Sequence, residues 1–240
     1  MNSKFKSLVL ILFLCFGVVG AEVERPVVIY RPVIIQTSSE HDLNVPKENL
    51  LCTYRVYNQY GEEVLICTGT GTAIDKRHIL TAAHVVFTPE VQPPGLKHFY
   101  TIDCFDEDGA YKKSIKAKLV KDDKDLDLAV LETESDLPHF KELDYGTISI
   151  GEAVYIIGCA WSRSPFNVSW GNFVAKENED MKGLSQCSNT VAPGMSGGGV
   201  YNQDGKFLGV IVRGTVSIGG LFVPNSTVKE FTKNFVKHDD

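Results

Sequence analysis

The sequence predicts an all-β protein, built either as one large unit or as two barrels of about 100 residues each. From Leu51 onward, short runs rich in β-branched and aromatic residues alternate with turn residues, a pattern typical of sandwiches and barrels. Removal of an expected 21-residue leader from the 240-residue chain leaves 219 residues, enough for either architecture. The last segment instead has apolar residues at helical spacing, at Val228, Phe231 and Phe235, so one short C-terminal helix is expected over 226–236.

The first 21 residues have the pattern of an export signal. Lys4 and Lys6 supply positive charge, Leu8–Val19 form an apolar run, and small residues lead to a cleavage site after Ala21. A membrane anchor is the alternative, but the run is shorter than the roughly 20 residues that a spanning helix needs. We therefore expect a soluble mature protein without a stable membrane anchor, exported to the periplasm or secreted.

Residues 22–50 are expected to form a lead-in to the folded domain at 51–240. Pro26 and Pro32 precede two β-branched runs, which fits an extended segment or an edge strand better than a core strand. The polar stretch Ser38–Asn49 is predicted to be a flexible linker, and removal of the lead-in as a pro-segment is an open alternative.

Charge and composition limit the ligands that the protein is expected to bind. A net charge of −6 and a pI near 5.5 argue against nucleic acid as the main partner. No C-x-x-C or H-x-x-x-H spacing occurs, so a zinc site is not expected, and the acidic turn Asp106–Gly109 fits a solvated turn better than a calcium site. We expect neither metal nor cofactor, and the sequence leaves the oligomeric state open.

Five cysteines lie outside the expected leader, namely Cys52, Cys67, Cys104, Cys159 and Cys187. In an oxidising compartment this odd number allows up to two disulfides and one free thiol. A hairpin with a two-residue loop at Gln59 and Tyr60 would place Cys52 opposite Cys67, close enough to form a disulfide.

Three residues of the right types for nucleophilic catalysis occur far apart in the chain. Ser196 stands in the glycine-rich turn Pro193–Gly199, where the backbone N–H groups are available, although most such turns are only turns. His84 closes a predicted strand of apolar and small residues. Asp127 is predicted to lie on one strand face with Asp125, but its flanking leucines make it the better candidate for a buried acid with a purpose. A serine nucleophile needs a base, and the base needs an orienting anion.

The segments around these residues resemble those of chymotrypsin-like serine proteases. Thr81-Ala82-Ala83-His84 resembles their histidine segment, Asp127–Leu131 their acid segment, and Gly194–Gly198 their nucleophile loop, while Gly209–Gly214 is similar to the strand that lines their cleft. Within that family, exported bacterial HtrA/Deg peptidases are the most similar, because two further segments match theirs, Val154–Gly158 and Leu221–Lys229.

This resemblance implies a fold of two antiparallel six-stranded β-barrels, the first at about 51–140 and the second at about 147–225, with the C-terminal helix after them. Because the sequence ends with that helix, no PDZ module is expected. The resemblance also implies a disulfide between Cys159 and Cys187, which would leave Cys104 free.

The resemblance assigns a role to each candidate residue. Ser196 would attack the scissile carbonyl, His84 would act as base and then as acid, and Asp127 would hold His84. The backbone N–H groups of Gly194 and Ser196 would bind the oxyanion. The partners would be protein or peptide substrates.

Two features of the sequence depart from trypsin-type enzymes. Met195 replaces the aspartate that anchors a newly cut N-terminus, so activation through that salt bridge is not expected. The specificity pocket should involve Thr190, Val212 and Gly214, and without an acid at its floor we expect a small or apolar P1 residue. Two alternatives to a protease are open: a binding protein with an idle triad, and an esterase with the same triad.

Overall fold

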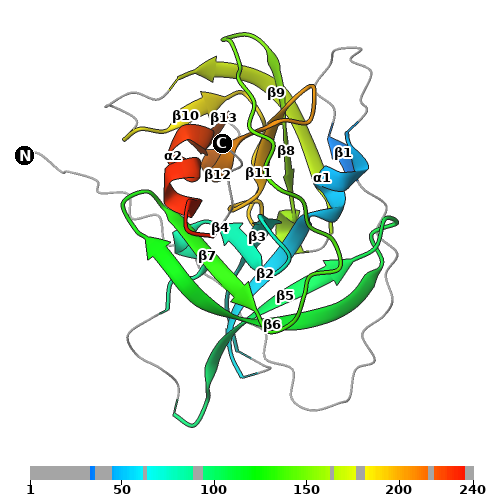
Figure 1. The fold of residues 1–240 in the computed structure, drawn as a ribbon, viewed down its shortest axis with the longest axis vertical. Coiled ribbons are helices and arrows are strands. Elements are labelled where there is room, and N and C mark those ends of the chain that lie inside the picture. The colour runs from blue at the N-terminus through cyan, green and yellow to red at the C-terminus, as the bar shows by residue number, and fades with distance from the viewer. Residues whose placement is uncertain are drawn as a thin grey trace, which may run out of the picture.

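The computed structural model describes residues 33–35, 45–61, 64–88, 94–162, 165–176, 182–215 and 219–235. These residues form two closed six-stranded antiparallel barrels stacked one on the other, with a short C-terminal helix beside them (Figure 1). The all-β, two-barrel fold class is therefore confirmed. The expected export signal lies outside the described residues, and among those described no helix is long and apolar enough to cross a membrane.

The first barrel closes in the order β2-β3-β4-β7-β6-β5, with β5 pairing back to β2. Its sequence folds this way because apolar and polar residues alternate: in β6 the inward Ile115 and Ala117 are buried, while Lys116 and Lys118 between and after them are exposed. Its strands are β2 (Thr53–Tyr60), β3 (Val64–Ala73), β4 (His78–Thr81), β5 (His98–Phe105), β6 (Tyr111–Asp123) and β7 (Leu128–Thr133).

The second barrel closes through pairing of its first two strands, β8 and β9. The short strand β1 (Val33–Ile35) joins β9 in parallel as a seventh, edge strand, within the lead-in where an edge strand was expected. The barrel's strands are β8 (Ala153–Gly158), β9 (Asn167–Ala175), β10 (Ser185–Cys187), β11 (Gly199–Asn202), β12 (Phe207–Thr215) and β13 (Gly219–Pro224).

A short helix, α1 (Lys47–Leu51), occupies the end of the stretch predicted to be a flexible linker. The prediction is wrong for this part because Asn49 is fully buried and bonded to the second barrel. Its side-chain N–H groups donate to the Tyr155 hydroxyl at 2.8 Å and to the Gly205 carbonyl at 3.0 Å. The polar sequence suggested a solvent-exposed linker, but the Asn49 amide is buried. Its two hydrogen bonds join the start of the first barrel to the second.

The C-terminal helix α2 (Asn225–Thr232) links the two barrels (Figure 1). Its buried Val228 and Phe231 pack into the core, and the helix lies against β12 and β13. From the first barrel, Lys121 donates a hydrogen bond of 2.6 Å to the Phe231 carbonyl and lies 4.3 Å from that ring. The ring of Phe235 lies 5.0 Å from that of His78. The helix thus stabilises the stacking of the barrels from one side.

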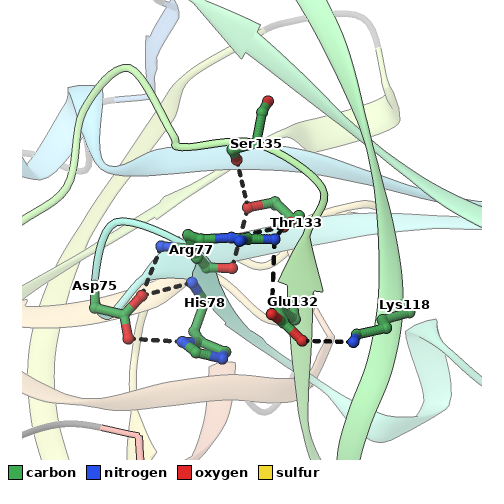
Figure 2. A network of polar contacts seen from close by, with 7 residues as sticks. All are labelled: Asp75, Arg77, His78, Lys118, Glu132, Thr133 and Ser135. Atoms are coloured by element: carbon green, nitrogen blue, oxygen red, sulfur yellow. Dashed lines mark hydrogen bonds and ion pairs between the residues drawn. The ribbon is translucent and has the colours of Figure 1, made fainter.

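A polar network fixes the turn that leads into β4 (Figure 2). The Asp75 carboxylate accepts hydrogen bonds from the backbone N–H groups of Arg77 and His78, at 2.6 and 2.7 Å, and contacts the His78 ring. The Arg77 guanidinium donates to the Thr133 carbonyl and lies 3.6 Å from Glu132. Because β4 runs from this turn directly toward His84, the network anchors the far end of the segment that carries that residue.

The five cysteines outside the expected leader are all unbonded thiols, so both expected disulfides are wrong. In the β2–β3 hairpin, Cys67 pairs with Asn58, because β2 continues through Tyr60 and a bulge shifts the register. Cys52 therefore lies six positions farther along, about 20 Å from Asn58 at strand spacing. Cys159 and Cys187 contact separate carbonyls, those of Pro165 and Gly220.

We expect the native thiols to react slowly with alkylating reagents. Burial raises the pKa of Cys52, Cys104, Cys159 and Cys187 to about 11, so at pH 8 only about a thousandth of each is thiolate. Iodoacetamide at pH 8 should modify the less buried Cys67 first. Urea without reductant should then expose all five, as measured by mass spectrometry. A pair that resists alkylation until reductant is added would contradict the unbonded assignment.

Removal of the Asn49 amide should destabilise the protein. Asn49→Ala leaves the buried Tyr155 hydroxyl and Gly205 carbonyl without that donor, so the free energy of unfolding should fall by about 1–3 kcal/mol. Urea denaturation measures the change. The neighbouring exposed Glu48→Ala is the matched control and should shift the midpoint little. Equal changes in the free energy of unfolding for the two variants would show that the hydrogen bonds of the Asn49 amide do not stabilise the protein.

Candidate functional site

The three candidate residues come from three separate elements at the junction of the barrels. His84 lies in the single-turn 3-10 helix η1 (Ala83–Val85), which follows β4 after one intervening residue. Asp127 is the last residue before β7, and Ser196 lies in the turn before β11. The strand positions expected for His84 and Asp127 are therefore wrong. Both residues stand in turns at strand ends, where side chains are freer to meet.

Asp127 holds both the backbone and the ring of His84. Its Oδ1 accepts the His84 backbone N–H at 2.9 Å, and its Oδ2 lies 2.8 Å from the ring Nδ1. Its own carbonyl accepts the Ala83 N–H at 3.1 Å. Because a carboxylate only accepts, Nδ1 carries the proton of the neutral ring and Nε2 is left as a proton acceptor. This is the tautomer that a general base requires.

The backbone of Asp127 adopts the left-handed conformation, with φ of 55°. Such a value is uncommon outside glycine and is tolerated more readily by aspartate than by most residues. Three hydrogen bonds from the η1 segment, two to the carboxylate and one to the carbonyl, hold the residue in this conformation. The side chain of Asp127 is 14% exposed and that of His84 44%, so Asp127 is sheltered while the His84 ring is open to solvent.

The turn that carries Ser196 is fixed against the first barrel. The Thr70 N–H donates to the Ser196 carbonyl at 2.8 Å, and the Gly197 N–H donates to the Ile211 carbonyl at 2.8 Å. Gly197, with φ of 88°, leaves no room for a Cβ, which would overlap the Thr70 carbonyl and the Thr81 hydroxyl. The serine turn therefore touches the segment that leads to His84. Within the described part of the chain, no hydrogen bond joins Ser196 to His84.

Two backbone N–H groups beside the serine have no hydrogen-bond acceptor among the described residues, those of Gly194 and Ser196. The neighbouring carbonyls are held by other donors. The Gly194 carbonyl accepts the Thr70 hydroxyl at 2.7 Å, and the Pro193 carbonyl accepts the Trp161 N–H at 2.7 Å. Gly194 has φ of 93°, a conformation that glycine adopts readily. The pair of N–H groups is thus available to an oxygen that carries negative charge.

Met195 anchors the turn by burial in the second barrel. It is only 2% exposed and belongs to an apolar cluster with Val154, Ile156 and Leu208. A Cβ on Gly158 would lie 2.9 Å from the Met195 Cβ, so that glycine is what admits the side chain. The sequence indicated only that Met195 cannot form the ion pair made by the aspartate of trypsin-type enzymes. In the structure, apolar packing of the Met195 side chain holds the turn instead.

Sequence reasoning missed two residues that support the turn. Thr70 contacts it twice, as described above, and its hydroxyl also accepts the Cys159 N–H at 2.8 Å. Trp161, in the 3-10 segment η2 (Ala160–Ser162), donates its N–H to the Pro193 carbonyl from a left-handed backbone conformation with φ of 57°, and the residue is 64% exposed. The only signal for Thr70 was a threonine between two glycines, and nothing in the sequence distinguished Trp161.

The three residues expected at the specificity pocket have different environments. Val212 is 2% exposed and packs in the core, while Thr190 is half-buried. A Cβ on Gly214 would lie 2.6 Å from the Cβ of Val191, and one on Gly220 would lie 3.1 Å from a methyl group of the same valine. The Val191 side chain therefore occupies the space between these two glycines.

Comparisons with known proteins identify the family of this chain. Residues 69–210 match the trypsin-like peptidase domain family. A protein of Hahella chejuensis described as "probable periplasmic serine endoprotease DegP-like" is 29% identical over 160 residues, which cover 64% of this chain and 31% of that protein. The chain thus spans about a third of the length of that relative.

Two solved structures share the fold. The crystal structure of Deg5 superposes with a TM-score of 0.62 at 22% identity, over 77% of this chain and 88% of that one. The serine endoprotease from Yersinia pestis gives a TM-score of 0.63 at 20% identity, over 80% of this chain and 67% of that one. At these identities the likeness shows the fold alone.

Met195→Ala should loosen the serine turn as well as the core. Loss of the buried side chain should lower the free energy of unfolding by about 2–5 kcal/mol, and Ser196 should react more slowly with a fluorophosphonate. Leu208→Ala, in the same cluster but on β12, is the matched control and should reduce stability alone. If both variants react with the reagent at the wild-type rate while folded, Met195 does not hold the turn.

Proposed function

We propose that this chain, which belongs to the trypsin-like peptidase domain family, is an exported serine endopeptidase. It would hydrolyse peptide bonds through Ser196, His84 and Asp127. The single observation that carries the proposal is the Asp127–His84 pair, with Nδ1 held at 2.8 Å, at the junction where the Ser196 turn meets the segment leading to that histidine.

In the acylation step, the Ser196 hydroxyl would attack the scissile carbonyl while Nε2 of His84 takes its proton. Asp127 would stabilise the imidazolium that forms. The N–H groups of Gly194 and Ser196 would donate to the oxyanion. His84 would then give the proton to the leaving amine as the C–N bond breaks, leaving an ester on Ser196.

In the deacylation step, water would attack that ester, with His84 again acting as base. Collapse of the second oxyanion would release the new carboxyl end of the substrate and return the proton to Ser196. The Ser196–His84 hydrogen bond would form when substrate closes the site, since such bonds often tighten only in the bound complex.

The substrate class would be proteins or peptides with a small residue before the scissile bond. Support comes from Val191, whose side chain occupies the space between Gly214 and Gly220 and would leave a shallow pocket. Thr190 and the backbone at Val212 and Gly214 would complete its walls. The leader-like first 21 residues and the described periplasmic relative support export to the periplasm or the exterior.

A fluorophosphonate probe tests the proposal. The wild-type protein should be labelled, and Ser196→Ala should lose both labelling and about 10⁴–10⁶-fold of its peptide hydrolysis. Ser135→Ala, at an exposed serine just after β7, is the matched control and should behave as wild type. A folded protein that is not labelled would support the idle binding protein. Labelling with turnover of esters but not of peptides would support the esterase.

A further inference from the structure

A pocket of about 440 Å³ opens directly beside the Asp127–His84 pair. It is bounded by both barrels, because Arg213 of β12 lines it together with residues from η1 and from the β6–β7 turn. Its apolar wall includes Phe87, which is 54% exposed, and Leu119. A substrate that places its scissile bond at Ser196 would pass this pocket within a few residues of that bond.

Two acids, Asp122 and Asp127, and two cations, Lys124 and Arg213, line the pocket. Both carboxylate oxygens of Asp127 already accept hydrogen bonds from His84. Asp122 lies near the end of β6, and Lys124 is the first residue after that strand. Arg213 comes from the other barrel, and among the described residues it makes no ion pair. The Arg213 guanidinium is therefore open to a carboxylate that comes from outside the chain.

The strand geometry explains why Arg213 faces this space. Ile211 and Val212 before it are both buried, and the pairing of β12 with β13 shifts register between Ile211 and Arg213. Such a bulge redirects the side chains that follow it. Arg213 is consequently the first side chain after the buried pair to reach solvent, and it does so at the pocket.

We infer that Arg213 selects substrates with an acidic side chain near the scissile bond, with glutamate favoured. A guanidinium without a partner binds a carboxylate through charge-assisted hydrogen bonds, and Phe87 and Leu119 would contact the methylene groups of glutamate. The inference rests on the proposed peptidase function and adds a preference by charge to the preference for a small residue at the cleavage point.

The test is a set of peptides with Glu, Gln or Lys placed in turn at each of four positions before and two after the cleaved bond. At one position kcat/KM should be about 3–10-fold higher for Glu than for Gln, a modest ratio because the pocket is open to solvent. The preference should weaken as NaCl is raised. Arg213→Gln should bring the Glu-to-Gln ratio near one, and Arg213→Glu should invert it in favour of Lys.

Lys176→Gln is the matched control, since it removes an exposed charge from the same barrel outside the pocket, and it should retain the wild-type ratio. Fluorophosphonate labelling distinguishes failure of the peptidase proposal from failure of the role inferred for Arg213. An unlabelled protein would reject the peptidase proposal itself. A labelled, peptide-cleaving protein with no acidic preference, or with one that survives Arg213→Gln, would overturn only the role of Arg213. A preference for Lys would do so too and would point to Asp122.

Discussion

The contact between Thr70 and the serine turn is the interaction on which the site depends. Thr70 is a fully buried residue of the first barrel, yet its N–H and hydroxyl bind the carbonyls of Ser196 and Gly194 in the second. These two bonds fix the turn relative to the strand that precedes His84. They also occupy the carbonyls of Gly194 and Ser196, while the N–H groups of the same two residues have no acceptor among the described residues. A buried donor between barrels is costly to leave unpaired, so the register of the two halves is strongly specified.

Met195 and Asp127 stabilise the two sides of the site by different physical means. Met195 inserts into an apolar cluster, so its contribution is non-directional and depends on the shape of the cavity that Gly158 leaves. Asp127 uses directional hydrogen bonds to a backbone N–H and a ring nitrogen. The apolar anchor sets where the serine turn lies, while the carboxylate sets the orientation and tautomer of His84. The turn therefore has its shape without an internal ion pair.

Much of the fold follows from local sequence patterns. The β-rich runs after Leu51 and the helical spacing of Val228 and Phe231 depend only on neighbouring residues, and the structure has the strands and the helix they predict. The predictions that failed depend on register or on distant contacts. β2 continues through Tyr60 and β3 has a one-residue bulge, so Cys67 lies opposite Asn58. The buried Asn49 holds the end of the expected linker as a packed helix.

The sequence alone determined the residue types of the candidate site and the order in which they occur. It identified His84, Asp127 and Ser196, and the missing ion pair at Met195. Only the tertiary structure decided that Asp127 would meet His84 from a left-handed turn, that Thr70 would hold the serine turn, and that Arg213 would line the adjacent pocket. Each of these contacts joins segments more than 40 positions apart. Their geometry is set by barrel closure and strand register, which no local stretch of sequence specifies.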